Sequence, residues 1–342
     1  MNNLDQQILQ LKIEGRSRAE IALMLGLTER TVKDRLSRIY EKLGGYENTI
    51  RFYSSQSVDN LFETMRKEIK DVNELNELFE FFRISEDDEK FFQEEVNFVN
   101  LTEHVKDDRI IIIPLGDLHW GSSYCNRRKI VELIFWAKEK KNVFFILMGD
   151  LIECATRDSV GDGVYKQILN PYDQFVQVSQ LFQYIKEKIL GVHIGNHEFR
   201  IAKSSSFNPC DLLARFLETK YLGFSALNTI KIGDNLYDIA TTHGTGGSRL
   251  PHIKLKKVID FSQIYLADIY CMGHVHERIT VPTEIKYRDG MDIKTKKRHF
   301  LLTGHFLEWK DSYAEMAMLL PSQIGVPIIE LNKNDYKIKI LT

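Results

Sequence analysis

From residue 109 onward, five short apolar runs each end at a polar tip made of residue types that bind metal ions. In chain order the tips are Gly116-Asp117-Leu118-His119, Gly149-Asp150, Gly195-Asn196-His197-Glu198, Thr242-His243-Gly244 and Gly273-His274-Val275-His276. Because the carboxyl ends of strands in a layered α/β fold open onto a common crevice, we expect these tips to converge. A glycine before four of the five tips lets the backbone turn sharply into that crevice.

The same part of the chain alternates between strand-like and helix-like segments. We expect strands at Ile110–Leu115, Val143–Met148, Gly191–Ile194, Tyr237–Thr242 and Asp268–Met272, and helices near 126–140, 171–190 and 208–219. Two later strand pairs flank turn signals. These are Val281–Tyr287 and Ile293–Thr303 around Asp289-Gly290, and Val326–Leu331 and Tyr336–Leu341 around Lys333-Asn334. The mixture predicts an α/β fold in which two packed sheets are flanked by helices, an αββα sandwich.

The tips share a ligand chemistry. They hold five histidines, two aspartates and one asparagine. Carboxylate and amide oxygens mixed with imidazoles suit divalent manganese, iron or zinc. Unrelated turn aspartates and core histidines explain poorly why all five tips stand at strand ends. The sequence therefore predicts a site for divalent metal ions where the tips meet.

The order of the tips resembles the signature of calcineurin-like metallophosphoesterases: DxH, GD, GNH, a later His, and GHxH, over roughly 109–310. The resemblance implies two divalent metal ions, manganese first, with iron or zinc as alternatives. One ion would be held by Asp117, His119, Asp150 and His276. The other would be held by Asp150, Asn196, His243 and His274. Asp150 would bridge the two ions.

The resemblance also implies a mechanism. Two cations about 3.5–4 Å apart lower the pKa of a bridging water, so a metal-bridging hydroxide would be the nucleophile. His197 would face the leaving group as general acid, an effect worth about 10²–10⁴-fold. Asp150 would be catalytic through its bridging position. Since no Cys or Ser nucleophile is required, we expect direct transfer to water.

The second tip departs from the protein phosphatases of this family. Those enzymes continue it as GDxVDRG, whereas this chain reads Gly149-Asp150-Leu151-Ile152-Glu153-Cys154, without the Arg that helps to hold phosphate. The chain looks more like the nuclease and phosphodiesterase branches. Arg200 is a candidate phosphate clamp, because a guanidinium binds phosphate oxygens in a fork; an ordinary surface or core-pairing Arg is the alternative. Loops at 153–170 and 199–210 would shape the pocket.

Residues 1–45 predict three short helices. Ser17 and Glu20 form a capping box for the second helix, Gly26 makes the following turn, and Thr28 caps the third helix. The arrangement resembles the helix-turn-helix of sigma-factor-like and response-regulator-like DNA-binding domains. Its third helix carries candidate DNA contacts. They are Arg30, Thr31, Lys33, Arg35 and Arg38. A trihelical packing unit without a DNA role is the alternative.

The segment between these parts is acidic. Residues 46–108 hold seven Lys/Arg and seventeen Asp/Glu (−10), whereas 1–45 hold eight and six (+2), and 109–342 hold thirty-one and twenty-five (+6). A naked nucleic-acid strand should avoid such a segment. We expect two amphipathic helices in it, at 57–82 and 85–100. The predicted organisation is a helix-turn-helix domain (1–45), an acidic helical connector (46–108) and a metallophosphoesterase domain (109–342).

The remaining features favour a cytoplasmic protein without a membrane partner. The N-terminus lacks a basic start followed by an apolar stretch, and no apolar run reaches the roughly 18 residues that span a bilayer. The four cysteines lie far apart and form no CxxC pair, as expected for reduced thiols. A homo-oligomer, formed through the C-terminal strand pair or the Phe-rich connector, is left open.

Three functional hypotheses follow. The first is a metal-dependent phosphodiesterase or nuclease that acts on nucleic acid and is tethered to DNA by its N-terminal module. The second is a phosphatase or phosphodiesterase of nucleotides or other small phosphoesters, with the N-terminal module used for assembly. The third is a DNA-binding regulator whose phosphoesterase domain senses a ligand. The complete ligand set, and the retention of His197, argue against the third.

Overall fold

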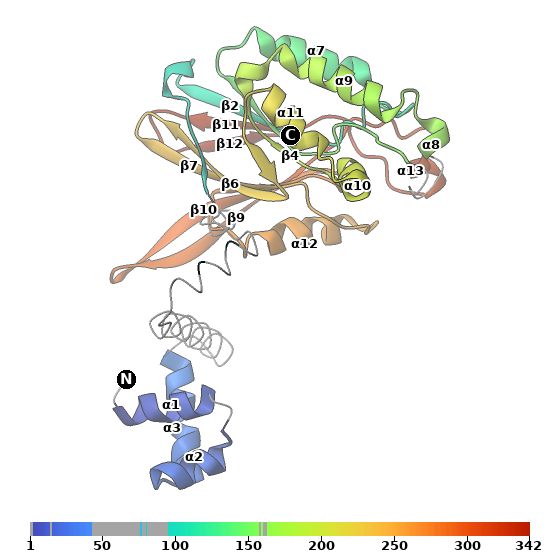
Figure 1. Ribbon diagram of the computed structural model, residues 1–342. Helices are drawn as coiled ribbons and strands as arrows, with labels where there is room; N and C mark the ends of the chain where they lie inside the picture. Colours follow the sequence, from blue (N-terminus) through green and yellow to red (C-terminus); the bar gives the residue numbers. More distant parts are fainter. Residues whose placement is uncertain are drawn as a thin grey trace. The chain divides into compact units, whose positions relative to one another are not determined.

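The computed structural model describes residues 3–13, 16–42, 76, 80, 95–156, 159 and 163–342. The chain divides into two compact units, Met1–Gln93 and Glu94–Thr342. Figure 1 shows both units, and each is considered by itself below. No helix in the described ranges is long and apolar enough to cross a membrane.

The first unit contains three helices among its described residues: α1 (Asn3–Ile13), α2 (Arg18–Leu25) and α3 (Glu29–Lys42). Their apolar faces meet in a small core that includes Ile8, Ile21 and Leu36. The capping box of α2 is confirmed, since Ser17 Oγ accepts from Glu20 N at 3.2 Å and Glu20 Oε2 accepts from Ser17 N at 2.7 Å. The helix ends at Gly26, whose φ of 65° is left-handed, as glycine permits.

The second unit is built on two six-stranded sheets within the described residues (Figure 1). The first sheet has the order β12-β11-β2-β3-β4-β5. Its strands are β2 (Arg109–Leu115), β3 (Val143–Leu147), β4 (Ile189–His193), β5 (Tyr221–Gly223), β11 (Ile328–Asn332) and β12 (Ile338–Leu341). The second sheet has the order β1-β6-β7-β8-β10-β9. Its strands are β1 (Asn97–Asn100), β6 (Ser225–Ile232), β7 (Asn235–Thr242), β8 (Ile269–Met272), β9 (Arg278–Asp289) and β10 (Asp292–Thr303).

Helices cover the outer faces of both sheets. The α-helices are α7 (Arg127–Lys138), α8 (Gly163–Lys166), α9 (Pro171–Gln183), α10 (Asn196–Ser205), α11 (Pro209–Phe216), α12 (Pro251–Phe261) and α13 (Tyr313–Met316), with 3-10 turns η1 (Thr102–His104) and η2 (Lys186–Lys188). The amino ends of α7, α9 and α11 are capped by asparagine side chains: Asn126, Asn170 and Asn208. An asparagine cap satisfies backbone donors that the first turn leaves without partners.

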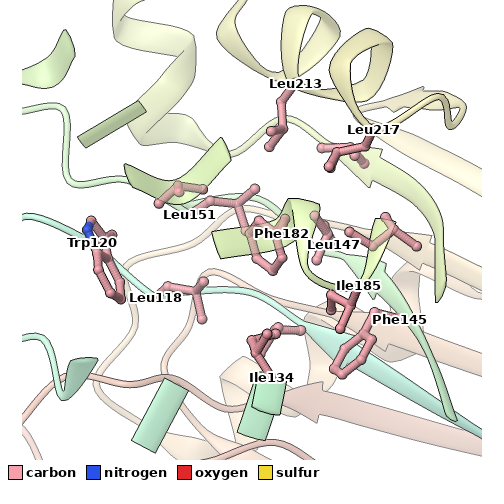
Figure 2. Close-up of a cluster of buried hydrophobic side chains, with 14 of the residues drawn as sticks. Leu118, Trp120, Ile134, Phe145, Leu147, Leu151, Phe182, Ile185, Leu213 and Leu217 are labelled. Carbon is pink, nitrogen blue, oxygen red and sulfur yellow. The ribbon is translucent and has the colours of Figure 1, made fainter. Parts of the chain in front are cut away.

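Strand β3 shows how the layers are built. All of its side chains are buried, because alternate residues of a strand point to opposite faces and both faces are covered. Phe145 and Leu147 pack under α7, α9 and α11 with Phe182 and Leu213, as Figure 2 shows. Phe144 faces the opposite way, into the core shared by the two sheets. The predicted two-sheet sandwich flanked by helices is therefore confirmed.

The outer face of the second sheet is closed by α12, which packs Val258 and Phe261 against Tyr270 and Phe300. At the edge of this sheet, β9 and β10 form the predicted hairpin around Gly290. The glycine has a φ of 61°, which suits its place in the turn.

One predicted helix is wrong over its last residues. The expected helix at 85–100 overlaps β1, an extended strand that pairs in parallel with β6. Asn97 Nδ2 donates to Leu190 O at 3.0 Å and to Asn228 Oδ1 at 2.9 Å, and Val99 packs into the core between the sheets. The open edge of β6 thus outweighs the local helical pattern. The expected helix at 57–82, and residues 85–94, lie outside the described residues apart from 76 and 80.

Candidate metal centre

The five predicted tips meet at one edge of the sandwich. Asp117 and His119 follow β2, and His276 follows β8 of the other sheet. His276 Nε2 lies 3.3 Å from Asp117 Oδ1 and 3.0 Å from His119 Nε2. These ligand atoms all lie within 4.8 Å of one another, a spacing that a single metal ion can bridge. Three of the four residues expected to hold the first ion therefore form one group.

The second expected group is assembled as well. His243 Nε2 lies 3.0 Å from Asn196 Oδ1, and His274 Nδ1 lies 2.7 Å from the same oxygen. Asp150 Oδ2 lies 3.3 Å from His243 Nε2 and 3.8 Å from His119 Nε2. Asp150 therefore stands between the two groups, the position that a bridging ligand needs.

The hydrogen bonds around the histidines show that a cation fits this cluster. Three imidazoles use one ring nitrogen to donate away from the centre: His119 Nδ1 to Glu153 Oε2 (3.0 Å), His243 Nδ1 to Met148 O (2.8 Å) and His274 Nε2 to Gly246 O (2.9 Å). A neutral imidazole has one N–H, so the other nitrogen presents a lone pair. Lone pairs and carboxylate oxygens thus face one another at about hydrogen-bond distance, an arrangement that a metal ion satisfies.

The pKa values of the cluster show its demand for positive charge. Burial lowers the pKa of His119, but the hydrogen bond and charge of Glu153, with the charge of Asp150, raise it to about 9. At His243, burial also lowers the pKa, but the charge and hydrogen bond of Asp150 outweigh burial and raise the pKa to about 10. Although burial raises the pKa of Asp150, the imidazoles of His243 and His197 hold it well below its usual value. Without metal, protons occupy places that a cation would take.

The backbone of the cluster is strained. Five of the seven candidate ligands have positive φ between 49° and 70°: Asp117, His119, Asp150, His274 and His276. Such conformations are rare for residues with a Cβ and gather at functional sites. The two loops that end in Asp150 and Asn196 also pack backbone to backbone. A Cβ at Gly195 would lie 2.1 Å from Asp150 N, so only glycine allows this approach.

The family comparison decides the identity of this fold. The sequence profile of calcineurin-like phosphoesterases matches residues 109–313, more than half of the chain.

This chain belongs to the calcineurin-like phosphoesterase family.

It is accordingly a metal-dependent phosphoester hydrolase. A second profile, that of sigma-70 region 4, matches residues 1–43, which contain the three N-terminal helices. No curated protein matches the chain. Among solved structures, a conserved uncharacterized protein of Streptococcus pneumoniae TIGR4, described as a predicted phosphoesterase, is 18% identical. The match covers 68% of this chain and 90% of that one, with a TM-score of 0.32.

His197 lies at the side of the phosphoesterase site. Its Nε2 is 3.9 Å from Asp150 Oδ2, and its Nδ1 donates to Glu153 O at 2.6 Å. Arg200 packs against the ring, with guanidinium nitrogens 3.2 Å and 3.3 Å from the two ring nitrogens. Burial lowers the pKa of His197 to about 4, although the nearby charge of Asp150 acts to raise it. The ring is therefore neutral near pH 7. Both residues that sequence placed at the leaving group and the substrate phosphate therefore lie together beside Asp150.

Glu198, in the third tip, has a role that the sequence analysis did not assign. Its buried carboxylate accepts from four backbone N–H groups: Gly195 at 3.1 Å, Asp150 at 3.0 Å, Leu151 at 2.6 Å and Ile152 at 3.0 Å. It joins the second tip to the third and so places Asp150 beside Asn196. The signal was present as the acidic residue three positions after Gly195, which also closes a capping box at α10.

Glu153 was also missed. Its side chain holds the Nδ1–H of His119, and its backbone oxygen holds that of His197. An outer carboxylate of this kind orients a ligand histidine and raises its basicity. In the sequence, Glu153 was visible only as part of the departure from GDxVDRG. The two expected loops are wrong in part. Residues 163–166 of the first form α8, and residues 199–205 and 209–210 of the second belong to α10 and α11.

The candidate DNA contacts on α3 divide into two kinds. Arg30, Lys33 and Arg38 are exposed. Arg35 instead donates to Asp5 Oδ1 at 2.7 Å and joins α3 to α1. Thr31 is half-buried, and its hydroxyl lies 2.8 Å from the hydroxyl of Thr28, just before α3.

Proposed function

We propose that this phosphoesterase is a two-metal phosphodiesterase that cleaves nucleic acid, with manganese as its metal, and that the helix-turn-helix tethers it to DNA. One observation carries the proposal: a phosphoesterase site with a complete candidate ligand set and a sigma-70 region 4 match occur in one chain. Such a tether raises the local concentration of the substrate without changing the chemistry.

The metal ions would be held by the seven residues whose lone pairs converge. Asp117, His119, Asp150 and His276 would hold one, and Asp150, Asn196, His243 and His274 the other. When bound, the two cations would activate water for attack and neutralise the phosphoryl oxygens. Glu198 would keep the two loops in register, and Glu153 would keep His119 in the tautomer whose lone pair faces the cluster.

His197 would protonate the leaving group. Its Nδ1–H is engaged by Glu153 O, so only Nε2 can deliver a proton. A pKa of about 4 leaves Nε2 unprotonated in the free enzyme. The negative charge of a bound phosphoryl group would raise that pKa, because a nearby anion favours the charged imidazolium. Proton donation would therefore be coupled to substrate binding.

Arg200 would hold a phosphate oxygen. Its guanidinium packs on the His197 ring and lies 3.4 Å from Ser159 Oγ, without a carboxylate partner among the described residues. A cation in this place can bind a phosphoryl oxygen in a fork while keeping His197 in position. The surface or core-pairing role considered for Arg200 explains these contacts less well.

A comparison of substrates tests this function. The purified protein with manganese would be given bis-p-nitrophenyl phosphate, p-nitrophenyl phosphate, and labelled single- and double-stranded DNA, with Asp150→Asn as the inactive control. We expect cleavage of the diester and of DNA, lost in the control. Turnover of the monoester alone would instead indicate a phosphatase of small phosphoesters, and binding without turnover would indicate a ligand-sensing regulator.

Deletion of residues 1–45 separates the tether from the chemistry. We expect weaker retention of DNA and unchanged hydrolysis of the small diester, because the metal cluster lies wholly in the second unit. Unchanged DNA affinity in this variant would contradict the tether and favour a packing or assembly role for the three helices.

A further inference from the structure

A sixth strand ends at the same edge as the five tips. Strand β10 stops at Thr303 and is followed by Gly304-His305, a glycine and a histidine as in the other tips. It runs parallel to β8, with Leu302 beside Met272, so its tip lies next to the one that holds His274 and His276. The topology therefore brings His305 to the phosphoesterase site.

The backbone around His305 is held on two sides. Gly325 N donates to His305 O at 2.9 Å, and Phe306 N donates to Asp117 O at 3.0 Å. Gly304 has a φ of 79°, and a Cβ there would lie 2.1 Å from Gly325 O. The tip is thus fixed directly against the loop that carries Asp117.

The ring of His305 has a buried donor without a partner. Only 6% of the residue is exposed, and the ring stacks on His276 with centroids 5.2 Å apart. Nδ1 accepts from Leu307 N at 3.1 Å, so the proton of the neutral ring is on Nε2. Within the described part of the chain, Nε2 has no hydrogen-bond partner. A buried donor in this state is satisfied when a bound ligand supplies an acceptor.

We propose that His305 is a substrate-binding residue, whose Nε2–H donates to a non-bridging phosphoryl oxygen. This rests on the function proposed above. The ring stacks on His276, beside Asp117, where the first cation would lie, and a phosphoryl oxygen bound by that cation is an anionic acceptor. A fixed donor at such an oxygen stabilises the charge that develops there during reaction.

Two substitutions separate this role from a structural one. His305→Asn keeps an oxygen near the place of Nδ1, so the bond from Leu307 N survives while the donor is lost. His305→Gln keeps an N–H near the place of Nε2 but loses the acceptor. We expect H305N to lower kcat/KM for the diester by about 10²-fold, as loss of one such donor does, and H305Q to stay at least about tenfold more active. The opposite order would show that His305 only holds Leu307, and would overturn the proposal.

Binding of inorganic phosphate gives a second readout. By calorimetry on the manganese-loaded protein, we expect H305N to bind phosphate about tenfold more weakly than wild type, as loss of a charge-assisted bond implies. Metal content should be unchanged, and His299→Asn on the same strand should behave as wild type. Equal affinity in wild type and H305N, no phosphate binding at all, or loss of metal from H305N would overturn the proposal. A wild type that binds phosphate but hydrolyses no phosphoester would refute the proposed function alone.

Discussion

The candidate functional residues of the two units lie in opposite environments, buried or half-buried in the second unit and mostly exposed in the first. At the phosphoesterase site, Asp117 and Asp150 are 0% and 1% exposed, and each lies in a group of candidate metal ligands. On α3 of the first unit, Arg30, Lys33 and Arg38 stand in solvent. A buried cluster acts through exact donor and acceptor positions, at short range, and is weakly screened by salt. Exposed cations act additively, and their effect falls as salt increases. Mutations should therefore have large local effects in one unit and small graded effects in the other.

The largest expected effect tests the buried side of this comparison. His197→Ala should lower kcat by about 10²–10⁴-fold, the range for loss of a general acid. Metal content should stay near normal, because His197 is not among the seven expected ligands; its ring lies in a third group with His119 and Glu153, whose ligand atoms are also within 4.8 Å of one another. Steady-state kinetics with metal analysis would check it. Loss of metal from this variant would show that His197 is a metal ligand rather than the general acid.

A buried histidine outside the site should make stability depend on pH. His193 is fully buried, donates from Nδ1 to Gly223 O at 3.0 Å and accepts at Nε2 from Thr241 at 2.7 Å. Burial lowers its pKa from 6.5 to about 4. The unfolded state therefore binds more protons between these values, so this contribution is present above pH 6.5 and is lost as pH falls through 4. It amounts to about 3 kcal/mol, of which about 2 kcal/mol is lost by pH 5.

Urea unfolding at pH 7 and pH 5 would check this dependence. His193→Gln should be less stable at pH 7 but should lose less stability on acidification than the wild type. An equal fall in the free energy of unfolding of the two proteins between pH 7 and pH 5 would show that protonation of His193 does not cause the pH dependence.

The smallest expected effects lie on α3. Lys33→Ala should weaken DNA binding only a few-fold and reduce the slope of log K against log salt by about 1, as loss of one phosphate contact does. Arg35→Ala is the matched comparison, because its guanidinium is engaged by Asp5 and its loss should lower helix stability rather than the salt slope. Titration of labelled duplex DNA at several salt concentrations would distinguish them. Equal changes in both variants would contradict the division between the paired Arg35 and the exposed Lys33.

The sequence predicted the parts of the site that depend on local pattern. A polar tip after a buried strand is visible in a few residues, and all five tips converge, with Asp150 between the groups. Parts that depend on distant partners were not predictable. Glu198 is important because its carboxylate accepts from four backbone donors in two loops. Glu153 is important because it accepts from His119, a histidine 34 residues away in the sequence. Strand β1 forms because β6, 131 residues on, offers an open edge.

The central claim is that the lone pairs of this cluster hold two divalent cations. It is tested most directly by crystals of the protein grown with manganese, using anomalous diffraction collected at the manganese edge. We predict two peaks about 3.5–4 Å apart, one among Asp117, His119, Asp150 and His276 and the other among Asp150, Asn196, His243 and His274. A single peak, peaks outside the cluster, or no peak with intact density for these side chains would contradict the account.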